Sequence, residues 1–217
     1  MPHSKAVAKK YNLVAALYDF LLPRYIQQTI GAALKDIELT PHQKILDIGC
    51  GTGPLEETLL KKFPQMDITA LDLSPQMLKA AQKKFEAPHR IRWIEGDFLE
   101  LALPTKHFDI AFSLSNFHYF PKPEAVLQKC VQILKPGGQI IIVDWDRNSW
   151  KGRLYNWGMK KWDTGFQKAY TLAEMQQMLG QNGFVFQKGE NFKTSLFWTM
   201  MSLVAETSDP RDPAPRR

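Results

Sequence analysis

LDIGCGTG, at residues 46–53, is the most informative stretch of the chain. The apolar run ahead of it, from Lys44 to Ile48, is typical of a strand, and leucines at 55, 59 and 60 indicate that a helix follows. Glycine has no Cβ, so closely spaced glycines permit a tight turn and let a ligand approach the backbone. The stretch therefore predicts a strand-turn-helix unit whose helix presents free N–H groups to a ligand.

An acidic residue stands where such a turn needs one to bind a nucleoside. The second predicted strand, residues 67–71, ends at Asp72, which lies 21 residues after Gly51. A carboxylate at that place accepts hydrogen bonds from ribose hydroxyls in nucleotide-binding α/β proteins. The turn and the acid together predict a nucleoside-containing ligand.

The glycine spacing argues against a dinucleotide. The GxGxxG pattern needs a third glycine at 54 or 56, and those positions hold Pro54 and Glu56. The glycines follow GxGxG instead, with Asp47 two residues ahead of the first one. An acid at 47 suits an ammonium group better than a pyrophosphate. The P-loop pattern GxxxxGK[ST] is also absent.

Outward from this unit, apolar runs alternate with helical patterns. Further strands are predicted at 90–94, 108–113 and 139–143, and helices after Ser74, over 123–134 and after Thr171. Two last strands, 184–190 and 195–205, look like a hairpin at one sheet edge. The alternation predicts an α/β fold of the Rossmann-like, doubly wound kind, with helices on both faces of a largely parallel sheet.

Composition excludes several other classes of protein. The chain has 217 residues, 44% of them apolar, which fits one folded domain rather than a disordered chain. The two cysteines, Cys50 and Cys130, are too few for a disulfide scaffold, and no zinc pattern occurs. No secretory signal or membrane-spanning run is evident. We expect a cytoplasmic protein without a metal.

The sequence resembles the class I S-adenosylmethionine-dependent methyltransferases, in particular the small-molecule branch that includes the ubiquinone and menaquinone biosynthesis enzymes. The matching stretches, in the order of the family, are LDIGCGTG at 46–53, LDLSPQML at 71–78, EGDF at 95–98, FDIAFSLSNFHYF at 108–120 and LKPGG at 134–138. Ahead of them, YNLVAALYD at 11–19 is similar to the N-terminal YDxxAxxYD helix of that branch, with Asn12 in place of Asp.

The resemblance implies a seven-stranded mixed sheet and a division of the chain. Residues 1–208 would form one methyltransferase domain, and 209–217 a disordered tail. Within the domain, 1–43 would supply capping helices, 44–146 the cofactor-binding core, and 147–170 a lid over the methyl acceptor.

The resemblance also implies S-adenosylmethionine as the cofactor and a role for each matching residue. The backbone of the three glycines would pass under the methionine part of the cofactor, and Asp47 would hold its amino group. Asp72 would accept hydrogen bonds from the ribose hydroxyls, and Asp97 would accept one from the adenine amino group. The remaining residues would flank the adenine. In chain order these residues are Asp47, Gly49, Gly51, Gly53, Asp72, Leu73, Met77, Asp97 and Phe98.

Two further residues are candidates for the acceptor side. His118 follows the fourth strand, where it would face the acceptor and take a proton from it, although a structural histidine is an open alternative. Tyr18 would close the site from the N-terminal helix.

Segment 147–170 carries six basic residues and a single acidic one, Asp163, among several aromatic residues. This composition suits a flat aromatic or anionic small molecule better than a nucleic acid.

Alternatives stay open at this point. An RNA methyltransferase would bind RNA through 147–170, and a non-catalytic S-adenosylmethionine-binding protein would share the core without turnover. A dinucleotide-dependent oxidoreductase is disfavoured by the glycine spacing. The identity of the acceptor, the atom methylated and the oligomeric state are not specified by the sequence.

Overall fold

A computed structural model describes residues 2–15, 17–85, 90–148, 157–158, 163, 165–194 and 199–208. Seven strands form one sheet in the order β3-β2-β1-β4-β5-β7-β6. The strands are β1 (Lys44–Ile48), β2 (Asp67–Asp72), β3 (Ile91–Glu95), β4 (Phe108–Leu114), β5 (Leu134–Trp145), β6 (Phe184–Lys193) and β7 (Thr199–Thr207). The first five are parallel, and β7 pairs antiparallel with both β5 and β6. The predicted fold class and the edge hairpin are confirmed.

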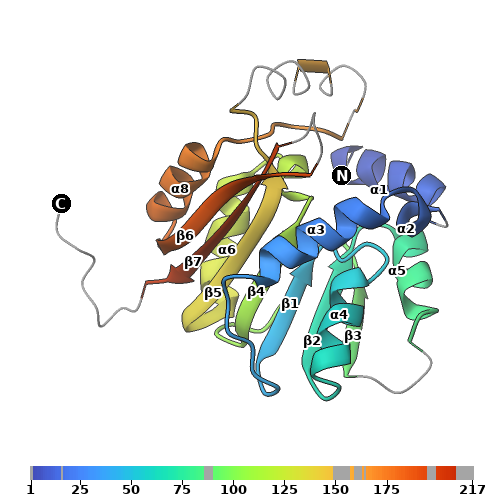
Figure 1. Cartoon of the computed structure of the whole chain (residues 1–217), viewed down its shortest axis with the longest axis horizontal. Helices are drawn as coiled ribbons and strands as arrows, with labels where there is room; N and C mark the ends of the chain where they lie inside the picture. Colours follow the sequence, from blue (N-terminus) through green and yellow to red (C-terminus); the bar gives the residue numbers. More distant parts are fainter. Residues whose placement is uncertain are drawn as a thin grey trace.

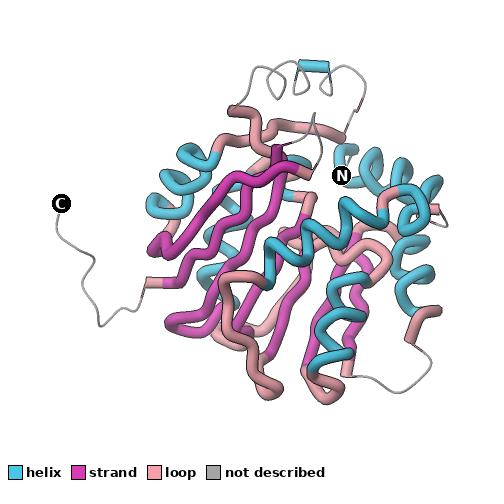
Figure 2. The backbone as a smooth tube through the Cα atoms, in the orientation of Figure 1, coloured by secondary structure: helices cyan, strands magenta, loops and turns pink. Residues whose placement is uncertain are grey.

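Helices cover both faces of the sheet (Figures 1 and 2). They are α1 (Pro2–Val14), α2 (Tyr18–Leu21), α3 (Pro23–Leu34), α4 (Pro54–Lys62), α5 (Pro75–Gln82), α6 (Pro123–Ile133) and α8 (Leu172–Gln181), with a short 3₁₀ turn, η1, at Phe117–Tyr119. Figure 1 places α1 and α2 together beside α5, near one end of the strands. The N-terminal helices thus lie next to the loops that leave the carboxyl ends of β2 and β3.

Side-chain alternation along the strands builds two apolar layers. In β5, Ile140 and Ile142 pack with the cluster that contains α6 and α8, whereas Ile141 and Val143 pack with the cluster of α3 and α4. All four are fully buried. A strand that is apolar on both sides requires cover on both sides, as its unbroken apolar run predicts.

Local sequence signals set several helix ends. Ser74 caps α5, since its side chain accepts a hydrogen bond from the Met77 N–H at 3.1 Å, and Pro75 takes the first helical position. Thr171 and Glu174 form a complete capping box at the start of α8. Both ends match the sequence expectation.

Two elements differ from expectation. β5 begins at Leu134, so LKPGG lies within the strand rather than ahead of it, and the strand's register with β4 shifts between Phe108 and Ile110. The expected single helix over 11–19 is interrupted, because α1 ends at Val14 and α2 begins at Tyr18. The break brings the rings of Tyr11 and Tyr18 within 6.1 Å of one another.

Part of the expected organisation lies outside the described residues. Of the expected lid, the structure describes 147–148, 157–158, 163 and 165–170. The rest of that segment, including Trp150, Tyr155 and Trp162, lies outside the described residues, and so does the expected tail at 209–217.

The capping box gives a stability test. Thr171→Ala removes the side-chain acceptor of the Glu174 N–H, so we expect a loss of about 1 kcal/mol. For a chain of this size that corresponds to a melting temperature lower by roughly 2–4 °C. Thr171→Ser keeps the hydroxyl and should melt close to wild type. An unchanged melting temperature in Thr171→Ala would show that the cap does not stabilise α8.

Candidate functional site

A cavity of about 500 Å³ lies at the carboxyl ends of β1, β2, β3 and β4. Its floor is the backbone that leaves these strands, and its wall includes α1 and α2. The lining residues that the sequence singled out are Tyr18, Gly49, Gly51, Asp72, Leu73, Met77, Asp97 and Phe98. In open α/β sheets this edge is where ligands bind.

Neighbouring atoms pack closely against the backbone of the glycine turn at some of its glycines and leave it open at another. Gly49 has a φ of +78°, which strains any residue with a Cβ, and a Cβ there would clash with the side-chain nitrogen of Asn116. Gly51 has a φ of +57° and no atom within 4 Å of a Cβ position, which leaves room for a ligand against its backbone. Gly53 lines neither this cavity nor the smaller pocket beside it; it begins α4 and packs near Ala81 and Trp93.

Asp72 joins the turn to the end of β2. One carboxylate oxygen accepts from the Gly51 N–H at 2.9 Å and the other from the Ser74 N–H at 2.8 Å. Burial raises the pKa of Asp72, against the lowering effect of these N–H donors. The carboxylate lines the cavity and retains acceptor capacity for hydroxyl groups.

Asp97 and Phe98 follow β3, the strand beside β2, and both residues line the cavity. One oxygen of Asp97 accepts from the Leu99 N–H at 3.0 Å, and the other accepts from the Ser4 hydroxyl of α1 at 2.6 Å. Phe98 and Met77 are buried and supply apolar wall. The cavity is therefore lined by two carboxylates, Asp72 and Asp97, and by apolar side chains.

Asp47 lines an adjoining pocket of about 60 Å³ rather than the main cavity. Tyr18, Gly49 and Gly51 line both spaces, so the pocket continues from the cavity past the glycine turn. Burial raises the pKa of Asp47 well above its ordinary range, and the charge of the neighbouring Glu56 raises it further. Burial likewise raises the pKa of Tyr18 to about 12, so this phenol stays protonated.

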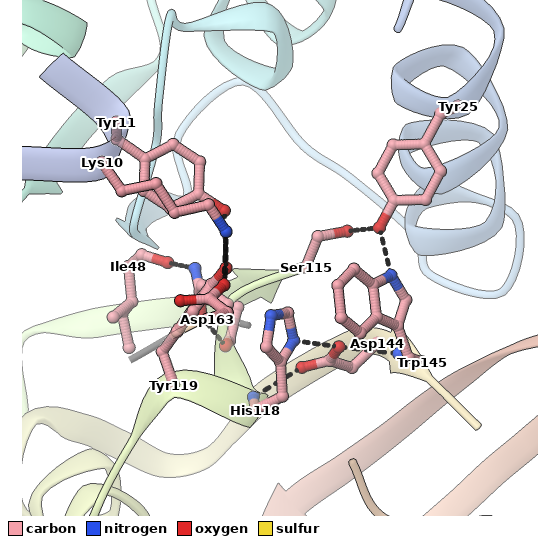
Figure 3. A network of polar contacts seen from close by, with 12 residues as sticks. Lys10, Tyr11, Tyr25, Ile48, Ser115, His118, Tyr119, Asp144, Trp145 and Asp163 are labelled. Carbon is pink, nitrogen blue, oxygen red and sulfur yellow. Dashed lines mark hydrogen bonds and ion pairs between the residues drawn. The ribbon is translucent and has the colours of Figure 1, made fainter. Parts of the chain in front are cut away.

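His118 is not among the residues that line the cavity. Figure 3 shows its imidazole beside Asp144 and Trp145. Its side chain is 1% exposed. Its backbone N–H donates to Asp144 at 2.9 Å, its Nδ1 lies 2.6 Å from the other oxygen of that carboxylate, and its ring stacks on Trp145 at 4.2 Å. The buried Nε2 has no hydrogen-bond partner among the described residues. The arrangement fixes the ring firmly in the interior.

A polar cluster that no sequence motif predicts also contributes to the cavity; Figure 3 shows Lys10, Tyr11, Tyr119 and Asp163 together. The Tyr119 hydroxyl donates to Asp163 at 3.0 Å and accepts from Lys10 Nζ at 2.8 Å. Lys10 also pairs with Asp163, and the Tyr11 hydroxyl lies 3.3 Å from that of Tyr119. Both tyrosines line the cavity. The contacts within this cluster join residues 44 to 153 positions apart in sequence, so no local motif could have revealed them.

The N-terminal helix is held against the cavity at two more points. Ser4 donates to Asp97, and a ring nitrogen of His3 lies 2.7 Å from the Tyr119 carbonyl oxygen. His3 and Ser4 also line the cavity. Helix α1 is therefore part of the site and not only a cap over it.

No group of three or more His, Cys, Asp or Glu side chains among the described residues is arranged to hold a metal ion. None of the helices described combines the length and the apolar character needed to cross a membrane.

Curated proteins of similar sequence are methyltransferases. A malonyl-[acyl-carrier protein] O-methyltransferase of Ilyobacter polytropus is 30% identical over 152 residues, covering 69% of this chain and 58% of that protein. A demethylmenaquinone methyltransferase of Thermotoga maritima is 28% identical over 159 residues, covering 72% and 67%. The chain spans between 54% and 62% of the length of four malonyl-[acyl-carrier protein] relatives.

Solved structures share the fold. A chain of the complex between the Trm112 methyltransferase activator and a methyltransferase of Haloferax volcanii superposes with a TM-score of 0.82 at 17% identity, covering 95% of this chain and 100% of that one. An S-adenosylmethionine-dependent methyltransferase of Mesorhizobium loti gives 0.70 at 19% identity, covering 83% and 99%.

The family model that matches this sequence is described as a methyltransferase domain and covers residues 45–138, from β1 into β5. That range contains the glycine turn, Asp72 and Asp97, which together line the cavity or the pocket beside it. The family's cofactor is S-adenosylmethionine, and the two carboxylates, the open glycine backbone and the apolar lining residues fit it. The chain belongs to the class I S-adenosylmethionine-dependent methyltransferases.

Proposed function

We propose that this chain transfers a methyl group from S-adenosylmethionine to a small-molecule acceptor bound in the same cavity. The observation that carries the proposal is that one cavity of about 500 Å³ is lined both by the family's cofactor-binding positions and by Tyr11 and Tyr119 of the tyrosine cluster. A cavity of this size is typical of small-molecule sites.

For the cofactor, the positions of the side chains support the following roles. Asp72 accepts hydrogen bonds from the two ribose hydroxyls, and Asp97 accepts one from the adenine amino group. Leu73, Met77 and Phe98 flank the adenine. Gly49 and Gly51 give backbone contact to the methionine part, Asp47 attracts its amino group, and Gly53 maintains the turn.

When bound, S-adenosylmethionine supplies a methyl group on a positively charged sulfur, so the protein has mainly to orient the acceptor and exclude water. Tyr18 supports this role because it lines both the cavity and the pocket beside it. We propose that it closes the site next to the methionine part of the cofactor. Its raised pKa keeps the hydroxyl protonated and able to donate.

An oxygen or nitrogen acceptor must also lose a proton. Tyr119 has a hydroxyl on the cavity wall, hydrogen-bonded to Asp163. Burial raises the pKa of Asp163, but Lys10 and the Gly165 N–H outweigh this, so its pKa is lowered and the carboxylate stays ionised. We propose that Tyr119 passes the acceptor's proton towards Asp163, and that His118, being enclosed, positions η1 and Trp145.

The acceptor proposed is a flat aromatic or anionic small molecule. Tyr11, Tyr119 and Phe120 supply aromatic wall, and Lys122 supplies positive charge at the cavity. Relatives named for demethylmenaquinone and for 2-methyl-6-phytyl-1,4-hydroquinone represent the first kind, and those named for malonyl-[acyl-carrier protein] the second. An RNA acceptor is the less favoured alternative, and salt-sensitive RNA binding would reveal it.

We further propose that residues 1–208 act as one domain, with capping helices at 1–43, a core at 44–146 and the acceptor segment at 147–170. Cys50 and Cys130 are both buried, unpaired thiols, which supports a reducing, cytoplasmic location.

The ribose assignment is tested through Asp72. We expect Asp72→Ala to weaken S-adenosylmethionine binding by about 1.5–3 kcal/mol, because hydrogen bonds to a charged group are lost. Isothermal titration calorimetry measures this directly. Asp67→Ala, at the opposite end of β2 and paired only at the surface with Arg90, is the matched control and should bind like wild type. Equal affinity in Asp72→Ala and wild type would refute the assignment.

Measurements of turnover and of melting temperature distinguish the proposed role of Tyr119 from that of His118. Tyr119→Phe removes the hydroxyl but keeps the ring, so turnover should fall roughly 10²-fold while cofactor affinity changes little. His118→Ala should lower the melting temperature and preserve turnover per folded molecule. Release of S-adenosylhomocysteine with hydroxylated aromatic and carboxylic thioester acceptors is the readout. A stable His118→Ala protein that has lost activity would instead identify His118 as the proton acceptor.

A further inference from the structure

Two carboxyl groups face one another beneath the glycine turn. Asp47 lies in β1, and Glu56 lies in the first turn of α4. Asp47 is 2% exposed and Glu56 is 0% exposed. One oxygen of Asp47 and both oxygens of Glu56 are buried without a hydrogen-bond donor among the described residues. Buried polar atoms nearly always have a partner, so this pair requires an explanation.

A shared proton supplies the missing donor. Two adjacent buried carboxylates repel one another in a medium that stabilises charge poorly, so they cannot both be ionised at neutral pH. Burial raises the pKa of Glu56 to about 7, and burial with the charge of Glu56 raises that of Asp47 well above its usual range. An O–H on one carboxyl then donates to the other.

The other charged and titratable groups nearby do not neutralise the pair. Asp72 adds negative charge to it, and burial keeps the Cys50 thiol neutral. Lys84 is the cation that lowers the pKa of Glu56, but its ammonium group already pairs with Asp19 at 2.5 Å. The phenols of Tyr18 and Tyr25 in the adjoining pocket both have raised pKa values and stay neutral. The pair therefore lacks a counter-cation from the described residues.

The charge and the polar atoms of the pocket that Asp47 lines suit a small cation. No Lys, Arg or His lies among its lining residues, all of which the structure describes. It holds a second buried oxygen without a partner, the Thr29 hydroxyl. It also opens into the main cavity past Tyr18, Gly49 and Gly51, so a group attached to a ligand in the cavity can reach it.

We propose that Glu56 shares one proton with Asp47 in the ligand-free protein, and that the ammonium group of the cofactor's methionine end takes the place of this proton. The carboxyl O–H bond breaks, the proton leaves to solvent, and ammonium N–H groups donate to the carboxylate instead. Cofactor binding then releases about one proton. The inference rests on the proposed placement of the cofactor and adds Glu56 as a residue that positions and charges Asp47.

The sign of the pH dependence follows from this exchange. At low pH the carboxyl pair keeps its shared proton, which the ammonium group has to displace, so the affinity for S-adenosylmethionine is weaker. As pH rises towards the point at which the free pair loses the proton, affinity should strengthen by up to about tenfold per pH unit. A ligand that shares the adenosine part but has no amino-acid end should show no such trend.

The experiment is calorimetric titration of the whole chain with S-adenosylmethionine at pH 7, in two buffers of different ionisation enthalpy. We expect release of about one proton, and almost none with 5′-methylthioadenosine. Glu56→Gln should abolish the release with S-adenosylmethionine, because the amide donates to Asp47 and leaves it ionised. Glu57→Gln, one position along the same helix at the surface, should release the proton like wild type.

The outcomes separate this inference from the proposed function. Binding of S-adenosylmethionine by wild type without proton release, or with equal release from 5′-methylthioadenosine, would overturn the inference and leave the function intact. Undiminished release in Glu56→Gln would also overturn it. Failure to bind either ligand at any pH would contradict the proposed function instead. The wild-type comparison of the two ligands decides the matter even where Glu56→Gln does not fold.

Discussion

The junction between the glycine turn and the end of β2 is the constraint on which the site depends. The N–H groups of Gly49 and Cys50 both donate to the Leu71 carbonyl, at 2.8 and 2.9 Å, and Gly51 donates to Asp72. These bonds hold the turn flat across the carboxyl end of the neighbouring strand. The positive φ at Gly49 favours a residue without a Cβ, and the Asn116 side chain from beyond β4 packs against the same backbone. Three parallel strands are thereby fixed around one cavity.

The residues that line the cavity come from two kinds of structure: local sequence motifs and contacts between residues far apart in the chain. The lining at the ends of the parallel strands consists of local motifs: the glycine turn, an acidic residue at a strand end, and a capped helix. The tyrosine cluster is instead assembled from α1, η1 and Asp163, which meet only in the folded chain. Lys10 links all three, since it bonds Tyr119 and Asp163.

This difference explains how far the sequence could predict the structure. Gly49, Asp72, Ser74 and Thr171 act through neighbours in the chain or through a fixed spacing, so the fold and the cavity floor were predictable. Tyr119 was not, because its partners are distant and a lone tyrosine after a strand carries no signal. His118 follows the same strand end, yet its enclosure by Asp144 and Trp145 depends on packing that periodicity does not encode. The orphaned oxygens of Glu56 became visible only once burial was known.

The central claim is that the cavity orients S-adenosylmethionine between the glycine turn and the tyrosine cluster. A crystal structure with S-adenosylhomocysteine bound tests it most directly. The account predicts ribose hydroxyls within hydrogen-bond distance of Asp72, the adenine beside Phe98 and Asp97, the amino group at Asp47, and the sulfur facing Tyr11 and Tyr119. A ligand bound elsewhere, or bound with its adenine at the Asp47 pocket, would contradict it.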